Sequence, residues 1–166
     1  MNAIAAVNTL QYIGKQGALL YSIKEDMAFF VAKTKGKTVV MGRKTLLSLP
    51  GGKGLKGRKN FVLSRSMTAE EAEAANVTAL ADPEALLLAI KKAGIPSEDV
   101  FVIGGGEVYK LLLPYCDTLY ITRVEDKTVG DVSFPDIPSD FSLIKGEMKH
   151  SDGFDYSFDT YVRQHS

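Results

Sequence analysis

Short apolar runs alternate with amphipathic segments along most of the chain. The runs lack a helical period, which predicts buried strands at NAIAAV, KTVVMG, NFVLS, DVFVIGGG and DTLYITRV. Helical spacing and helix-end residues predict helices from about Ile23 to Thr34, over RKTLLSL, over DPEALLLAIKKAG and over EVYKLLL. Strands that alternate with helices predict an α/β fold with a mostly parallel sheet.

The C-terminal part of the chain carries a strand-like alternation instead. The segment FSLIKGEMKHSDGFDYSFDTYVR alternates around Asp152-Gly153, a dipeptide typical of two-residue hairpin turns. The alternation puts one set of side chains on a common face: Phe154, Tyr156, Phe158, Thr160 and Val162. We therefore expect an antiparallel C-terminal hairpin at one edge of the parallel sheet.

The first predicted helix carries an aspartate where a core residue is expected. Ser22 and Glu25 match the S-x-x-E capping box, in which Ser22 would cap the helix and Glu25 would close it. Asp26 would then occupy the fourth helical position, on the same face as Ile23 and Phe30. An unpaired buried carboxylate must find a partner or stay protonated part of the time. No basic residue nearby in the sequence supplies that partner, which points to a ligand.

Composition narrows the class of protein. The 166 residues suit one domain, and 45% hydrophobic with 24% charged residues is typical of a soluble globule. The chain lacks signal-peptide features and any run of the roughly 20 apolar residues that span a membrane, and Cys116 is its only cysteine, so we expect a cytoplasmic protein. The only histidines, His150 and His165, lie late in the chain, so neither a metal site nor a Ser-His-Asp triad is expected.

The zero net charge conceals an uneven distribution. Residues 1–66 hold 12 Lys and Arg against two acidic residues, a balance of +10, whereas residues 67–166 hold 8 against 18, a balance of −10. The basic half indicates anionic ligands, although the two halves could instead attract each other in the fold. Nucleic acid is not expected, because the basic residues are not interleaved with a row of aromatic residues.

Three predicted strands end in residues suited to anions. Ligands of parallel sheets bind at the carboxyl ends of the strands, and here these ends read VIGGG, MGRKT and LSRS. Each sequence alone could be only a tight turn or a surface charge, but together they predict a nucleotide ligand. No G-x-G-x-x-G directly follows a predicted strand and opens a helix, because the match GKGLKG lies in the basic glycine-rich loop, and the chain contains no G-x-x-x-x-G-K-[ST]. A standard Rossmann fingerprint and a P-loop are therefore excluded.

These segments together resemble the dihydrofolate reductase family over essentially the whole chain. The matching segments occur in the family's order and spacing: NAIAAV, IGKQGALLYSIKEDMAFF, VVMGRKT, LKGRKNFVLSR, VIGGGEVY, LYITRV and GDVSFP. The resemblance implies one α/β domain over residues 1–166, with a mostly parallel sheet of about eight strands and four main helices. Leu20-Tyr21 departs from the Pro-Trp that the family often has in its active-site loop, and SLPGGKGLKGRK is a residue or so longer than in some bacterial members.

The resemblance also implies a reaction, the reduction of dihydrofolate to tetrahydrofolate with NADPH as cofactor. Asp26 matches the acidic residue that binds ring N3 and the 2-amino group of the pterin, while a water delivers the proton to N5 and the nicotinamide delivers a hydride to C6. Thr122 matches the hydroxyl beside that aspartate, and Tyr21 could hold a water there. The implied catalytic residues are therefore Asp26, Tyr21 and Thr122.

The other site residues carry over one by one. The implied substrate contacts are Ile4, Ala5, Asp26, Met27, Phe30, Leu55, Arg58, Ile103 and Tyr109, of which Arg58 would pair with the α-carboxylate of the glutamate tail. Plain core positions are the alternative for Ile4, Ile103 and Phe30. The implied cofactor contacts on the nicotinamide side are Ala6, Ile13, Gly14 and Leu19. Those toward the phosphates are Gly42, Arg43, Lys44, Thr45, Leu63, Ser64, Arg65, Gly104, Gly105, Gly106, Glu107 and Val108.

Two other functions remain open at this point. A reductase of the same fold could act on another pterin or a pyrimidine, as in riboflavin synthesis, but Asp26 and Arg58 together argue against it. A nucleotide-binding module without catalysis would not need an aspartate on an apolar helix face. The expected partners are dihydrofolate, NADPH and antifolate inhibitors, in a monomer without nucleic acid or membrane contacts.

Overall fold

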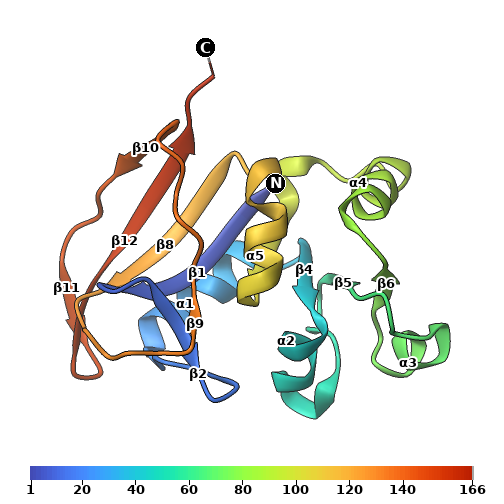
Figure 1. Ribbon diagram of the computed structural model, residues 1–166, viewed down its shortest axis with the longest axis horizontal. Coiled ribbons are helices and arrows are strands. Elements are labelled where there is room, and N and C mark those ends of the chain that lie inside the picture. Colours follow the sequence, from blue (N-terminus) through green and yellow to red (C-terminus); the bar gives the residue numbers. More distant parts are fainter. Residues whose placement is uncertain (166) are drawn as a thin grey trace.

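The computed structural model describes residues 1–165, which form an α/β fold around one large sheet (Figure 1). Eight strands follow the order β10-β12-β8-β1-β7-β4-β5-β6, and β11 pairs with β12 as a ninth. Their bounds are β1 Asn2–Asn8, β4 Thr38–Gly42, β5 Lys59–Leu63, β6 Thr78–Leu80, β7 Val100–Gly104, β8 Thr118–Val124, β10 Phe141–Ile144, β11 Lys149–Ser151 and β12 Phe154–Arg163. A second, small sheet runs β3 (Ala18–Leu19), β2 (Tyr12–Lys15), β9 (Val132–Ser133).

The directions of the strands confirm the predicted mixture. The pairs among β1, β4, β5, β6, β7 and β8 are all parallel, whereas β12 runs antiparallel to β8, β10 and β11. The turn between β11 and β12 falls at Asp152 and Gly153, which both have positive φ, as a tight hairpin turn requires. The mostly parallel sheet with an antiparallel C-terminal hairpin is therefore confirmed.

Five α-helices connect the strands and cover both faces of the sheet. They are α1 Lys24–Thr34, α2 Arg43–Ser48, α3 Ala69–Ala74, α4 Pro83–Lys92 and α5 Gly106–Leu112, with short 3-10 turns at Pro50–Gly52, Ser97–Asp99 and Leu113–Tyr115. Figure 1 shows α1 behind the sheet and α5 in front of it. One core cluster lies under α4 and α5, and a second lies between the sheet, α1 and α2. No helix among the described residues is long and apolar enough to cross a membrane.

The predicted start of α1 is wrong in its details. The helix begins at Lys24, its N-cap is Ile23, and Ser22 makes no capping hydrogen bond. The backbone amide of Lys24 instead donates to Oδ2 of Asp152 in the β11–β12 turn, at 3.0 Å. The hairpin therefore supplies an acceptor for the first amide of the helix, no capping box forms at Ser22, and Asp26 becomes the third residue of the helix.

Candidate active site

Asp26 lies on the side of α1 that packs against the sheet. Its Oδ1 accepts a hydrogen bond of 2.6 Å from the hydroxyl of Thr122 on β8. Thr122 is buried and stands opposite Ala6 of β1 in the parallel register. Asp26 itself is half-buried, and burial raises the pKa of its carboxyl, a rise that the Thr122 hydrogen bond partly offsets. Within residues 1–165 the partner of Asp26 is thus a hydroxyl and not a cation.

Four of the predicted substrate contacts belong to one hydrophobic cluster. Ile4, Phe30, Leu55 and Ile103 come from β1, α1, the α2–β5 connection and β7, and all pack in the core between the sheet, α1 and α2. Ile4 is almost fully buried, whereas the other three keep part of their surface exposed. Phe30 lies about one helical turn after Asp26, so an apolar surface adjoins the carboxylate.

The remaining apolar substrate candidates lie outside this cluster. Met27 is 53% exposed on α1. Tyr109 and Ala5 pack with the core cluster on the opposite face of the sheet. The hydroxyl of Tyr109 donates to the backbone carbonyl of Ile4 at 2.7 Å, and burial raises its pKa, which keeps it protonated. Tyr109 therefore fixes the backbone of β1 beside the predicted site.

Arg58 is half-buried and held by uncharged acceptors. Its Nε and Nη2 donate to the hydroxyl of Thr34 at 3.3 and 3.2 Å, and Nη1 donates to the carbonyl of Lys56 at 2.7 Å. Among the ion pairs of residues 1–165, none involves Arg58. An arginine fixed in place without a carboxylate partner suits an anionic ligand.

Tyr21 makes hydrogen bonds to two polar side chains outside the predicted site. Its hydroxyl donates to Oδ2 of Asp126 at 2.5 Å and accepts a bond from Nδ2 of Asn8 at 3.0 Å. Its ring packs edge-on against Phe154, with ring centres 4.9 Å apart. Burial, and next the hydrogen bond with Asp126, raise the pKa of Tyr21 to about 12. Tyr21 shares no hydrogen bond with Asp26 in the described chain, and it anchors the end of the loop that precedes α1.

The parallel register brings the three predicted cofactor segments together. Gly42 at the end of β4 pairs with Leu63 at the end of β5. On its other side β4 pairs with β7, which ends at Gly104. The segments GRKT, LSRS and GGG therefore leave the sheet from adjacent strands at the same edge. This is the position at which parallel sheets bind ligands.

The backbone at this edge is closely packed on one side and open on the other. A Cβ on Gly42 would lie 2.9 Å from Cγ2 of Val108, so the end of β4 requires glycine. A Cβ on Gly105 would meet only the hydroxyl of Thr45, at 3.6 Å, and one on Gly104 would come 3.5 Å from the same hydroxyl. Open space beside Gly105 and a nearby hydroxyl fit the phosphate groups of a dinucleotide.

Arg43 is the best-connected cation of the predicted cofactor site. Its Nη2 donates to Oε2 of Glu71 at 2.5 Å, and its Nη1 donates to the hydroxyl of Ser66 at 3.2 Å. The hydroxyl of Ser64 accepts the backbone amide of Met67 at 3.1 Å and so closes the turn after β5. Three further predicted cofactor residues are exposed: Lys44, Arg65 and Glu107.

The small sheet connects the predicted nicotinamide side to the glycine segment. Gly14 on β2 pairs with Val132 on β9, and a Cβ on Gly106 would lie 2.8 Å from Cγ1 of Val132. The β9 strand therefore sits between the loop and the start of α5. Ile13 is buried, whereas Leu19 at the loop tip is 76% exposed.

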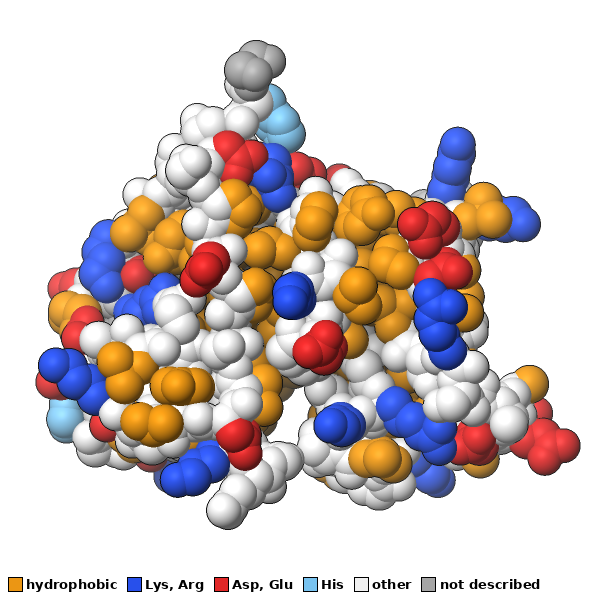
Figure 2. Space-filling view, in the orientation of Figure 1, with side chains coloured by type: hydrophobic (Ala, Val, Ile, Leu, Met, Phe, Trp, Pro, Cys, Tyr) orange, Lys and Arg blue, Asp and Glu red, His pale blue; other side chains and the backbone are white. Residues whose placement is uncertain are grey.

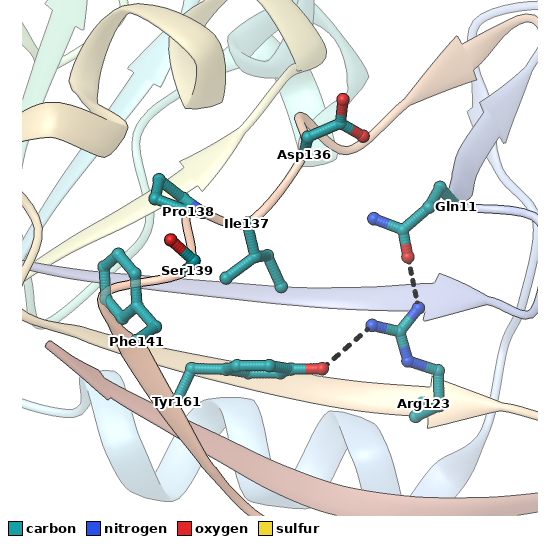
Figure 3. A pocket seen from close by; sticks show the side chains of 8 residues that line it. All are labelled: Gln11, Arg123, Asp136, Ile137, Pro138, Ser139, Phe141 and Tyr161. Atoms are coloured by element: carbon teal, nitrogen blue, oxygen red, sulfur yellow. Dashed lines mark hydrogen bonds between the residues drawn. The ribbon is translucent and has the colours of Figure 1, made fainter.

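A cavity lined by Arg123 and Tyr161 lies beside β8, and Figure 3 shows the side chains around it. Successive side chains of a strand point to opposite faces, so Arg123 faces away from Thr122. Arg123 lines this cavity of about 420 Å³ and donates to the carbonyl of Asn8 at 3.1 Å and to Oε1 of Gln11 at 2.6 Å. It thereby fastens the start of the loop to β8, and the cavity adjoins none of the predicted site residues.

The structure supports both explanations of the charge asymmetry. Two ion pairs join a cation of the basic half to a carboxylate of the acidic half, Lys37–Asp99 and Arg43–Glu71, whereas Lys149–Glu25 joins the halves with the charges reversed. Figure 2 also shows Lys and Arg side chains gathered around α2, beside acidic side chains at α3. Lys44, Lys53 and Lys56 in this region belong to no ion pair of residues 1–165.

Four residues around the site were not selected by the sequence analysis. Asn8 and Asp126 bind Tyr21, Asp131 accepts the backbone amide of Gln16 at 2.9 Å, and Glu71 binds Arg43. Only Glu71 had a local signal, the capping-box sequence TAEE. The other three bind residues that are either more than a hundred positions away or on the far side of a loop, and no local sequence pattern indicates such contacts.

Comparisons with known proteins agree with this arrangement. The family model described as dihydrofolate reductase matches residues 1–163. A dihydrofolate reductase of Bacillus subtilis (strain 168) is 34% identical over 98% of this chain and 94% of its own length. A dihydrofolate reductase of Neisseria meningitidis serogroup A is 42% identical over 81% of this chain and 78% of its own length. One of Staphylococcus haemolyticus is 29% identical over 98% of this chain and 95% of its own length. The chain therefore belongs to the dihydrofolate reductase family.

Proposed function

We propose that this protein reduces 7,8-dihydrofolate to 5,6,7,8-tetrahydrofolate with NADPH. The observation that carries the proposal is Asp26, a half-buried carboxylate that meets a hydroxyl and an apolar cluster but no cation. Burying such a group lowers the stability of the free protein, and hydrogen bonds donated by a ligand offset this loss. Family membership supports the same reaction.

Only one oxygen of the Asp26 carboxylate accepts a hydrogen bond within the described residues. Thr122 donates to Oδ1, which leaves Oδ2 and the remaining lone pair of Oδ1 for ring N3 and the 2-amino group of a pterin. Because burial raises the pKa of Asp26, its negative charge is strongly stabilised by a protonated pterin ring. Thr122 acts as a positioning residue, since its hydrogen bond from β8 orients the carboxylate. When bound, NADPH supplies the hydride.

Arg58 is the proposed partner of the α-carboxylate on the glutamate tail. Thr34 and the carbonyl of Lys56 hold the guanidinium at the far end of α1 from Asp26, while no acidic side chain of the described residues neutralises it. Leu55 and Phe30 lie in the cluster between these two polar anchors, where they would contact the pterin and benzoyl rings. The substrate thus meets a carboxylate at one end and an arginine at the other.

The cofactor proposal rests on the strand ends around Gly42, Gly104 and Gly105. The backbone at Gly105, beside the hydroxyl of Thr45, suits the pyrophosphate. Arg43 with Ser64 and Arg65 suits a 2′-phosphate. This set favours NADPH over NADH. The nicotinamide would lie between Ala6 and the loop of Ile13 and Gly14.

The proposal also includes a cytoplasmic monomer that binds antifolates. All proposed site residues come from one chain, and Cys116, the single cysteine, is buried and unpaired, which suits a reducing compartment. Light scattering and binding of a diaminopyrimidine would test these points.

One assay tests the proposed reaction. Purified protein should oxidise NADPH when dihydrofolate is added, with the loss of absorbance near that expected for one NADPH per dihydrofolate. A pyrimidine substrate of riboflavin synthesis serves as the control and should give no oxidation. Oxidation with that pyrimidine and none with dihydrofolate would refute the proposal.

A further inference from the structure

We propose that Glu71 competes with the 2′-phosphate of the cofactor for Arg43 and thereby sets how strongly NADPH is preferred over NADH. This inference rests on the proposed function. The Arg43–Glu71 pair is the only ion pair of residues 1–165 that engages a proposed cofactor residue. Its distance is 2.5 Å, and both side chains are about two-fifths exposed, so a ligand can reach them.

Glu71 is fixed in place by the helix that carries it. Thr68 is the N-cap of α3, and its hydroxyl accepts the backbone amide of Glu71 at 3.1 Å. In return, Oε1 of Glu71 accepts the backbone amide of Thr68 at 3.1 Å. This capping box uses Oε1 and leaves Oε2 for Arg43. The capping bonds with Thr68, and then the charge of Arg43, hold the pKa of Glu71 below its usual value, so it is ionised at neutral pH.

Glu71 occupies the side of the Arg43 guanidinium that a phosphate would contact. Nη2 donates to Glu71 and Nη1 to Ser66, so one N–H of each terminal nitrogen is already used. A phosphate must therefore displace Glu71 or share Arg43 with a carboxylate of the same sign of charge. NADH lacks the 2′-phosphate and does not meet this competition.

The decisive comparison is Glu71→Gln against Glu70→Gln. Gln keeps the acceptor oxygen that closes the capping box but removes the negative charge. Glu70 is the neighbouring exposed glutamate on α3 and has no ion pair among the described residues, so it controls for the general loss of one charge. Dissociation constants for NADPH, NADH and adenosine 2′,5′-bisphosphate would be measured by calorimetry at low and high salt, with thermal unfolding as a check on folding.

We expect Glu71→Gln to bind NADPH and the bisphosphate about two- to fivefold more tightly than wild type, the upper part of the range typical of exposed ion pairs. Its affinity for NADH should stay within about twofold, and the gain should shrink at high salt. Glu70→Gln should change all three constants by less than about twofold. In an Arg43→Met background, Glu71→Gln should no longer tighten NADPH binding.

Three results would overturn the inference. Unchanged or weaker NADPH binding by Glu71→Gln would mean that Glu71 positions Arg43 and does not compete for it. A gain that persists in the Arg43→Met background would mean a general charge effect. A wild-type protein that binds NADH as tightly as NADPH would overturn the proposed 2′-phosphate site as well, whereas the first two results would leave that site intact.

Discussion

Replacement of Asp26 by Asn should make the free protein more stable and the enzyme far less active. Asn keeps the shape of the side chain and can still accept the Thr122 hydrogen bond through Oδ1. It removes a charge that is half-buried and lacks a cationic partner among residues 1–165. Burying a polar group without full compensation costs about 1–3 kcal/mol, and the partial exposure of Asp26 favours the lower end. We therefore expect a gain of about 1 kcal/mol in the free energy of unfolding at pH 7.

The raised pKa of Asp26 determines how the stability difference between Asp26→Asn and wild type changes with pH. Because the folded-state pKa of Asp26 is raised, its neutral form is favoured by folding. Its contribution to stability is present at pH below about 3.9, the unfolded value, and is lost as the pH rises through the folded pKa. The advantage of Asp26→Asn over wild type should accordingly appear as the pH rises through the folded pKa of Asp26, and disappear in acid.

The same substitution removes the charge that favours a protonated pterin. We expect turnover at neutral pH to fall on the order of 10²-fold or more, with partial recovery at low pH. Urea unfolding from pH 4 to 8 and NADPH oxidation over the same range measure the two effects on the same samples. Thr122→Val is the matched control, since it deletes a hydrogen bond to Asp26 but keeps the charge. A variant with normal turnover, or with no gain in stability at pH 7, would refute the reasoning.

Three other substitutions test separate contacts. Tyr21→Phe should lower the unfolding free energy by about 1–2 kcal/mol and speed proteolysis of residues 9–20, because the bond to Asp126 is lost, whereas Tyr156→Phe should leave that proteolysis unchanged. Asp152→Ala should destabilise the protein by about 1 kcal/mol in urea unfolding, since the first amide of α1 loses its acceptor; an unchanged midpoint would show that packing alone sets the helix start. Arg58→Leu should raise the KM for dihydrofolate about tenfold or more and leave kcat nearly constant, because the contact is expected to be equally strong in the ground state and the transition state. A fall in kcat as large as the rise in KM would contradict this.

Local sequence signals predicted those elements whose stabilising contacts are also local. Asp82 caps α4 through the backbone amide of Ala85, at 2.8 Å, and Pro83 and Gly94 lie just inside and just past the helix, as the pattern indicated. The Asp152-Gly153 turn is a similar case, because the positive φ of both residues is a property of the turn itself. Buried strands were found because continuous apolar runs need burial on both faces.

The loop between β1 and α1 could not be predicted in this way. Its strands β2 and β3 are short, and β2 pairs with β9, which lies more than a hundred residues later. Tyr21 and Asp126 are likewise 105 residues apart. Side-chain contacts of this kind depend on the assembled fold, so the sequence did not indicate that Tyr21 would bind Asn8 and Asp126.

Two S/T-x-x-E sequences of this chain lie at the start of a helix, Ser22–Glu25 and Thr68–Glu71, and only one of them forms a capping box. At α1, the hydroxyl of Tyr156 donates to Glu25 at 2.5 Å, and Asp152 accepts the first helical amide, so neighbours in the fold replace the Ser22–Glu25 box. At α3, no such neighbour intervenes at Thr68, and the box closes.

A capping box uses only one oxygen of the glutamate, so the other oxygen can bind a second partner. At α1 the glutamate is drawn to β12 and ties the helix to the hairpin. At α3 the closed box holds the glutamate still and presents its second oxygen to Arg43. A motif that stabilises one turn of helix therefore also holds a negative charge beside Arg43 of the proposed cofactor site, because the capping bond leaves Oε2 of Glu71 available.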